Sequence, residues 1–403
     1  MRLKLIHYIV FTMLVLYGIN HLLFEKELFF NEILSLAGFL IFVKYSFKKN
    51  FKIQIPKLDI FNLLLFFWGL CGFYVLISVF FKTNWYFYFR HFVFFYSTFT
   101  FFIAFFWKDQ FLLFMQKIRK KFTLLILLLI PAYPPTYEGR FLDRFSGSVF
   151  FPFFFKRLHF LAYFLLLILN FIYAYFFQSF TGTIMAILVF IILIIPSYSL
   201  FRLLFFTAFI SFVMLFIYLS PNLAKYSEGA KGSRLFGNQE RVYQSSKILA
   251  ADPNSSWRMV YWYRVVVEKF PENLLGIGFG TPYLPYVEGR DTADSNYDDK
   301  YDAHLTGVHN SYITMFARLG ILAILFFFAL YTTILKEFYC FKKYYTDNNH
   351  IVFFIGFFAI SLIALFNPVL ETPTYSGIYW FFLGLVAKSI HERRLTNENP
   401  AST

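Results

Sequence analysis

Long apolar blocks separated by short basic segments dominate the chain. Each block approaches the roughly 20 residues that a helix needs to cross a bilayer. This pattern predicts an all-α, polytopic transmembrane helical bundle. The expected spans lie near residues 4–23, 31–47, 59–81, 88–107, 122–134, 157–177, 180–197, 201–219, 310–334, 351–369 and 374–388.

The distribution of Lys and Arg predicts the orientation of the bundle. Basic clusters at the N-terminus, at 44–57, at 108–121 and after residue 335 favour the cytoplasm. Counting back from the C-terminus places the polar segment 220–308 outside, whereas counting forward from the N-terminus places it inside. One element within 135–219 is therefore miscounted, and we expect ten or twelve spans with both termini cytoplasmic.

Three regions follow from this pattern: an N-terminal bundle at 1–219, a loop domain at 220–308, and C-terminal helices with a short tail at 309–403. The loop has the composition of a soluble domain, with turn signals and a helix-like stretch. We expect it to fold against the outer face of the bundle as a large, partly helical periplasmic loop.

Composition excludes a soluble protein. Hydrophobic residues make up 59% of the 403 residues, charged residues 15%, and the mean hydropathy is +0.57. The net charge of +14 resides mostly in short segments between apolar blocks, which indicates membrane orientation and no nucleic-acid partner. Two cysteines do not form a disulfide framework or a structural zinc site.

Within the loop, the sequence predicts a helix from Trp257 to Phe270, capped by the polar residues at 254–256 and ended by Pro271. Arg258 shares a helix face with Trp262, while Arg264 points elsewhere. The five residues from Gly276 to Gly280 follow, with glycine at every second position. These glycines permit tight turns and close backbone approach to a ligand.

The loop ends at His309-Asn310-Ser311-Tyr312, where the next apolar block begins. His309 is therefore expected at the outer membrane surface, at the mouth of the bundle. Arg318, nine residues further on, is an intramembrane charge that is either functional, ion-paired or snorkelling.

In this order, these elements resemble the bacterial O-antigen ligase and O-antigen polymerase family, in which they bracket a large periplasmic loop. The elements are Trp257-Arg258 with Trp262, then Leu274 to Gly280, then His309 to Tyr312 followed by Gly320. The resemblance is strong over about 220–335 and general in the multi-span frame on either side.

The resemblance implies a type-C-like glycosyltransferase of the bacterial inner membrane, multi-pass, with its active face in the periplasm. The implied reaction is metal-independent and inverting, without a cofactor. The donor would be an undecaprenyl-pyrophosphate-linked oligosaccharide. The acceptor would be lipid A core for a ligase, or a lipid-linked glycan for a polymerase; membrane lipids are further partners.

Elementary chemistry agrees with this reaction. A guanidinium stabilises a departing pyrophosphate without a metal, a role we assign to Arg258. A neutral imidazole accepts the proton of an attacking hydroxyl, a role we assign to His309. The expected substrate-binding residues are Arg264, Arg144, Arg140, Asn310, Tyr312 and Trp262.

One departure from the family concerns the second pyrophosphate arginine. Many members carry a Ser-Arg-Gly-like element before the loop, whereas the nearest stretch here, 178–182, lacks arginine. Arg144, and then Arg140, are candidate replacements, the alternative being that both are juxtamembrane anchors.

Three alternatives remain open from the sequence. Ligase and polymerase share a leaving group and differ only in the acceptor, and we favour the ligase. A transporter or flippase for lipid-linked sugars would usually show short loops and paired repeats, which are not visible here. A metal-dependent relative would need an early acidic pair, for which Glu25 and Glu27 are the only candidates.

Overall fold

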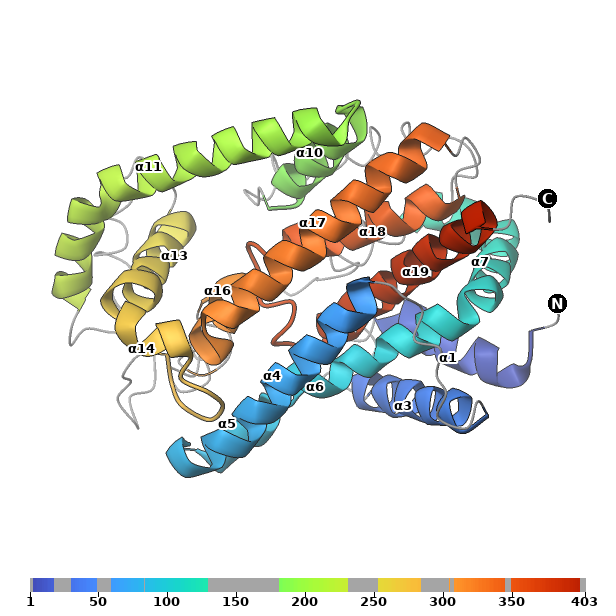
Figure 1. Cartoon of the computed structure of the whole chain (residues 1–403), viewed down its shortest axis with the longest axis horizontal. Helices are drawn as coiled ribbons and strands as arrows, with labels where there is room; N and C mark the ends of the chain where they lie inside the picture. The colour runs from blue at the N-terminus through green and yellow to red at the C-terminus, as the bar shows by residue number, and fades with distance from the viewer. Residues whose placement is uncertain are drawn as a thin grey trace.

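The structure is a computed structural model that describes residues 3–17, 30–48, 59–82, 84–129, 181–230, 253–283, 304, 308–344 and 349–398. Every regular element in these ranges is helical, so the all-α prediction is confirmed for them (Figure 1). The elements are α1 (Leu5–Tyr17), α3 (Phe30–Lys48), α4 (Asp59–Phe81), α5 (Trp85–Arg90), α6 (Val93–Tyr96), the 3-10 turn η1 (Ser97–Phe99), α7 (Thr100–Leu129), α10 (Thr181–Ile194), α11 (Tyr198–Ala230), α13 (Pro253–Tyr263), the π-helical turn η3 (Arg264–Glu268), α14 (Phe270–Leu275), α16 (Ser311–Leu319), α17 (Ile321–Tyr344), α18 (Asn349–Ile363) and α19 (Pro373–Glu398).

Four helical stretches among the described residues are long and apolar enough to cross a membrane: Asp59–Phe81, Trp85–Lys117, Tyr198–Leu223 and Ile321–Lys342. Leu5–Leu14 and His350–Ile363 are shorter apolar helices. The chain is therefore a helical membrane protein. The total of ten to twelve spans stays a prediction, and the expected span 157–177 lies outside the described residues.

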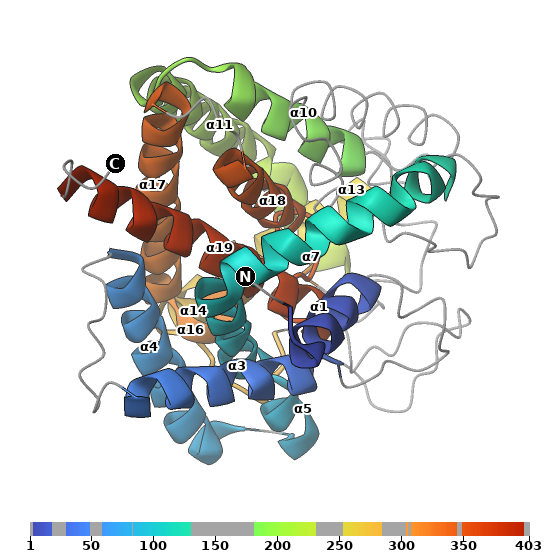
Figure 2. The ribbon, with the colours of Figure 1, turned by 90° about the vertical axis from the view of Figure 1, so that its right-hand side faces the viewer.

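Close approach of backbones holds the centre of the bundle together. α19 packs along α7, and a Cβ at Gly384 would lie 2.8 Å from the Cβ of Ala104. A Cβ at Gly377, also on α19, would meet the side-chain oxygen of Asn31 on α3. Figure 2 shows α3, α7 and α19 together. Small residues at helix crossings permit this contact in lipid, where apolar surface alone gives little drive for helices to associate.

Aromatic side chains fill the remaining space. The ring of Phe67 on α4 stacks on Phe326 of α17 at a centroid distance of 4.7 Å, and lies 5.3 Å from Trp380 of α19. Such offset pairs add stabilisation beyond the area that they bury. They fix α4, α17 and α19 as one unit.

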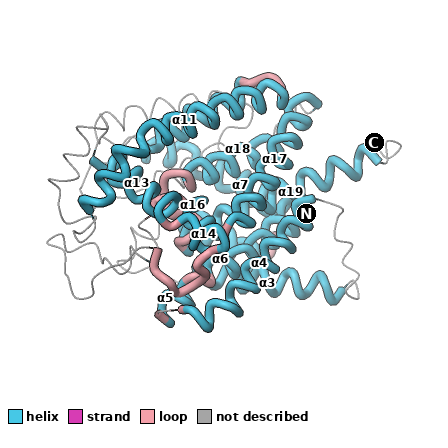
Figure 3. Tube along the Cα trace, turned by 60° about the vertical axis from the view of Figure 1, so that its left-hand side comes forward, coloured by secondary structure: helices cyan, strands magenta, loops and turns pink. Residues whose placement is uncertain are grey.

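The two ends of the bundle differ in character. Both termini and the basic C-terminal ends of α17 and α19 lie at one end, while α13, α14 and α16 lie at the other (Figure 1). Loops gather around α14 and α16 at that second end (Figure 3). Segregation of the basic residues is consistent with the expected orientation, in which the end carrying α16 faces the periplasm.

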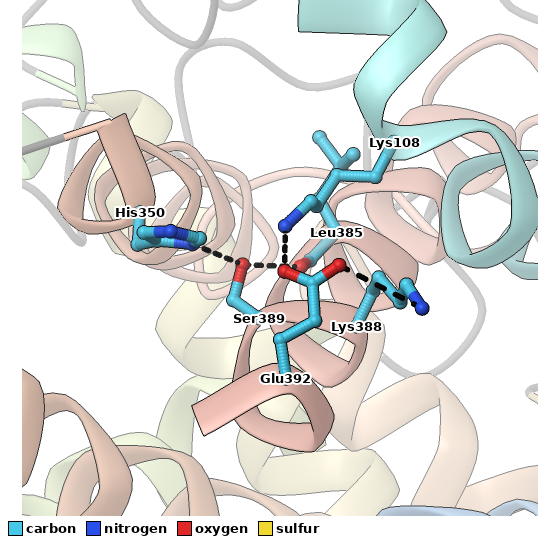
Figure 4. Close-up of polar contacts among 6 residues, drawn as sticks. All are labelled: Lys108, His350, Leu385, Lys388, Ser389 and Glu392. Atoms are coloured by element: carbon cyan, nitrogen blue, oxygen red, sulfur yellow. Dashed lines mark hydrogen bonds and ion pairs between the residues drawn. The ribbon is translucent and has the colours of Figure 1, made fainter. Parts of the chain in front are cut away.

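Ion pairs tie the helices together at the end that carries the termini. Lys108 of α7, 3% exposed, pairs with Glu392 of α19, whose other oxygen lies 3.6 Å from Lys388 (Figure 4). His350 of α18 donates a ring hydrogen bond of 3.0 Å to Ser389 of α19. This cluster links α7, α18 and α19 far from α16.

Two expected boundaries in the apolar segments are wrong. The basic stretch 108–121 is not a loop, because α7 continues through it to Leu129 with a kink at Trp107 (φ −118°, ψ 23°). The expected loop boundary at 220 is also wrong, since α11 continues to Ala230 with Pro221 inside it. Hydropathy marks where apolar residues end, whereas helical hydrogen bonding continues through basic and polar residues.

The predicted single span 310–334 is divided at Gly320. α16 ends there and α17 begins at Ile321, because Gly320 adopts φ +70°. The predicted helix 257–270 is also divided: α13 begins at Pro253, becomes π-helical at Arg264, and gives way to α14, in which Pro271 occupies the first turn. Proline is well suited to a first turn, so Pro271 begins a helix there and does not end one.

Replacement of Gly320 by alanine should destabilise the fold. A Cβ there would lie 2.6 Å from the Leu274 carbonyl oxygen in a left-handed backbone, a strain of about 1–3 kcal/mol. Gly320→Ala should lower the melting temperature of the detergent-solubilised protein. Gly69→Ala is the matched control, because a Cβ at Gly69 has nothing within 4 Å. Equal melting temperatures for the two variants would contradict this packing.

Candidate active site

The backbone holds His309 in a strained conformation at the start of α16. Its φ of +45° is the only positive value at a non-glycine position among the described residues. The residues on either side are both anchored: Trp262 Nε1 donates to the Val308 carbonyl at 2.6 Å, and Asn310 caps α16 by accepting from the backbone N–H of Tyr312 and Ile313. Strain retained in this way is typical of functional positions.

Arg258 approaches the same place from α13. Its Nη1 donates to the Phe366 carbonyl at 3.1 Å, in the segment between α18 and α19. Its positive charge lies close enough to His309 to act on that ring. Burial, and secondarily the charge of Arg258, lower the pKa of His309 to about 3, so the imidazole is neutral at physiological pH. The structure thus brings the two predicted catalytic residues together.

The segment that contains the alternating glycines, residues 276–283, is termed here the glycine loop. On one side it pairs with the last turn of α16: Ile277 N–H donates to the Ala317 carbonyl at 2.8 Å, and Gly278 N–H to the Arg318 carbonyl at 3.0 Å. The loop therefore continues the hydrogen bonding of α16.

On the other side the glycine loop docks on α4 and on the helical turns that follow it. Phe279 N–H donates to Ser78 Oγ at 2.8 Å, and Gly280 N–H to His91 Nδ1 at 3.0 Å. His91 uses its other nitrogen, Nε2, to donate to the His304 carbonyl at 2.9 Å. His91 is therefore a neutral ring with its proton on Nε2.

The close approach that the glycines allow is to the protein itself. Gly276, Gly278 and Gly280 have φ of +86°, +71° and +79°. A Cβ on Gly276 would lie 2.7 Å from the Arg318 carbonyl oxygen, and one on Gly280 would lie 2.9 Å from the Asn84 carbonyl oxygen. The sequence suggested that these glycines let the backbone approach a ligand. In the structure they allow tight packing against α16 and the start of α5.

Arg318 makes no ion pair within the described part of the chain, and it does not snorkel. It is fully buried, and its guanidinium donates to the carbonyls of Gly278 (3.1 Å), Thr281 and His304. Its Cζ lies 4.0 Å above the centre of the Tyr283 ring. The cation therefore fastens the glycine loop and residue 304 onto α16.

Comparison with known proteins bears on this arrangement. Residues 162–328 match the family described as O-antigen ligase. These residues make up less than half of the chain, and over this segment the chain is similar to that family. No curated protein and no solved structure matches the chain.

The other predicted binding residues have structural partners where they are described. Arg264 is buried on η3 with Glu268 at 3.6 Å. The Tyr312 hydroxyl donates to the Ser361 carbonyl at 2.8 Å and meets Tyr331. Their binding roles stay predictions. Arg140 and Arg144 lie outside the described residues.

The sequence analysis missed one acid of the site. Glu371, 2% exposed, lies between α18 and α19 and accepts a hydrogen bond from Ser311 Oγ on α16. It is the only acidic residue between Asp347 and Glu392, a signal that was available in the sequence. An isolated carboxylate in an apolar stretch costs free energy to bury, so such a residue is a candidate for a specific role.

The folding stability of the protein should depend on pH through Glu371. Burial raises the pKa of Glu371 to about 7, above its ordinary value near 4.5. Because the folded pKa is raised, Glu371 stabilises the fold at low pH, and this contribution, on the order of 3 kcal/mol, is lost as the pH rises through 7. Glu371→Gln should therefore gain melting temperature over the wild type at pH 8 and not at pH 5. An equal difference at both pH values would contradict burial of an ionisable Glu371.

Proposed function

We propose that the protein transfers an oligosaccharide from undecaprenyl pyrophosphate to an acceptor hydroxyl at the periplasmic face of the inner membrane, as an O-antigen ligase acting on lipid A core. Similarity to the O-antigen ligase family over residues 162–328 supports lipid-linked glycan substrates. The observation that supports this function best is the pairing of a neutral, strained His309 with Arg258 at the end of the bundle opposite the termini.

In the proposed reaction, the oxygen of the acceptor hydroxyl attacks the anomeric carbon of the donor. The bond from that carbon to the pyrophosphate oxygen breaks, and its electron pair leaves on the pyrophosphate. Attack from the opposite side inverts the anomeric centre. The hydroxyl proton passes to the imidazole of His309.

Arg258 has two roles in this reaction. Its guanidinium binds the diphosphate and stabilises the charge that grows on it as the bond breaks, without a metal. A bound diphosphate also offsets the positive charge that lowers the pKa of His309. His309 therefore becomes a stronger base when the donor is in place.

The second candidate function is O-antigen polymerase, which joins lipid-linked repeat units by the same chemistry. The family description favours ligase. A lipid-linked sugar transporter or flippase would not need a histidine beside the arginine, because no proton is removed from a hydroxyl during transport.

Loss of either catalytic side chain should abolish transfer. His309→Ala and Arg258→Ala should each lower the rate by about 100-fold or more, since a general base and an electrostatic stabiliser each contribute at least that factor. The rate is measured with purified protein in proteoliposomes, an undecaprenyl-pyrophosphate-linked oligosaccharide and lipid A core, with EDTA present.

The matched control is Lys269→Ala, a cation of the same loop that pairs with Glu272 at 2.9 Å and should leave the rate unchanged. Wild-type transfer by both the His309 and the Arg258 variants, or loss of transfer in EDTA, would rule out the proposed mechanism.

Ligase and polymerase are separated by the glycan pattern of a deletion strain. Loss of a ligase should leave lipid A core without any attached glycan, because no other step joins the two. Loss of a polymerase should leave core carrying a single repeat unit. The measurement is the ladder of lipopolysaccharide bands on a gel. A single-repeat band in the deletion strain would contradict the ligase and indicate a polymerase.

A further inference from the structure

The segment 364–372, which joins α18 to α19 and is termed here the connector, contacts both predicted catalytic residues or their immediate neighbours. At one point, the Phe366 carbonyl accepts from Arg258 Nη1 at 3.1 Å. At another, the Ala364 carbonyl accepts from the backbone N–H of Ser311 at 2.9 Å, two residues after His309. The connector thus bridges α13 and the start of α16.

The Ser311 hydroxyl lies at the centre of the second contact. Its oxygen accepts from the backbone N–H of Val369 at 2.8 Å and of Leu370 at 3.0 Å. A hydroxyl oxygen has two lone pairs, so both are used. Its one proton must be donated, and the closest acceptor is Glu371 Oε2, nearer than the Asn367 carbonyl at 3.2 Å.

Glu371 is held by groups from each element that packs on it. On α16, Thr314 faces its carboxyl group, and the charge of Arg318 acts on that group. Tyr283 of the glycine loop faces the same group. Burial of a carboxyl group is costly, and the hydrogen bond from Ser311 offsets part of that cost.

We propose that Glu371 is a positioning residue: through its bond to Ser311 it fixes His309 relative to Arg258, which the same connector holds. This inference rests on the proposed function, because it concerns the distance between the base and the pyrophosphate-binding cation.

The two contacts of the connector are separable. Arg258 is held by a main-chain carbonyl, so a change of the Glu371 side chain leaves that hydrogen bond intact. His309 depends on Ser311, whose hydroxyl would lose its closer acceptor and keep only the Asn367 carbonyl at 3.2 Å. Removal of the Glu371 oxygen should therefore lower kcat, which depends on the base, and leave the KM for the donor unchanged.

Only one acceptor oxygen is required at position 371. An amide or a protonated carboxyl supplies one, so the negative charge is not needed for positioning. Glu371→Gln should therefore retain the wild-type kcat. This separates a hydrogen-bond role from a role of the charge itself.

The test compares Glu371→Leu, Glu371→Gln and Ser311→Ala with the wild type in the proteoliposome assay, with the lipid-pyrophosphate donor titrated. Glu371→Leu and Ser311→Ala should lose about 100-fold in kcat, the cost of a misplacement of about 1 Å, at an unchanged donor KM. Glu371→Gln should match the wild type. His309→Ala and Arg258→Ala are assayed in parallel.

Each outcome decides the matter. The positioning role would be overturned by a wild-type kcat in Glu371→Leu, by a raised donor KM in that variant, or by an inactive Glu371→Gln. In each of these cases, inactive His309→Ala and Arg258→Ala variants would still support the proposed function. Full activity of those two variants would overturn the function itself. If Glu371→Leu does not accumulate in the membrane, Ser311→Ala decides, because Asn310 still caps α16 in it.

Discussion

One buried cation holds the candidate active site together. The guanidinium of Arg318 donates to two main-chain carbonyls of the glycine loop and to the carbonyl of His304. Burial of a guanidinium is costly unless acceptors face its N–H groups, and each of these carbonyls gains a charged donor from it. The mutual requirement forces the loop, α16 and residue 304 into one arrangement.

The rest of the site depends on that arrangement. Once the glycine loop lies against α16, the backbone at Gly320 has no room to continue one helix into the next, and α16 separates from α17. The short helix is then free to direct its first residues toward α13 and the connector. If residues 310–334 formed one continuous helix, the position of His309 would be set only by the tilt of that helix.

Sequence reasoning reached the helical class, the membrane character and the pairing of His309 with Arg258. Each rests on a local signal: apolar blocks, a basic bias, or a short ordered motif. It missed the break at Gly320, since one glycine in an apolar block is also compatible with an unbroken helix. It missed Glu371 and the connector because their partners lie about 60 residues away along the chain and only the fold brings them together.

The left-handed backbone at His309 limits which amino acids the position accepts. Positive φ is tolerated by asparagine, aspartate and histidine far better than by branched or bulky side chains. Of these, only histidine is a neutral base near physiological pH, so conformation and chemistry select the same residue. An asparagine would adopt the same backbone conformation but would not accept a proton. A single substitution at this position therefore separates the backbone conformation from the basicity of the side chain.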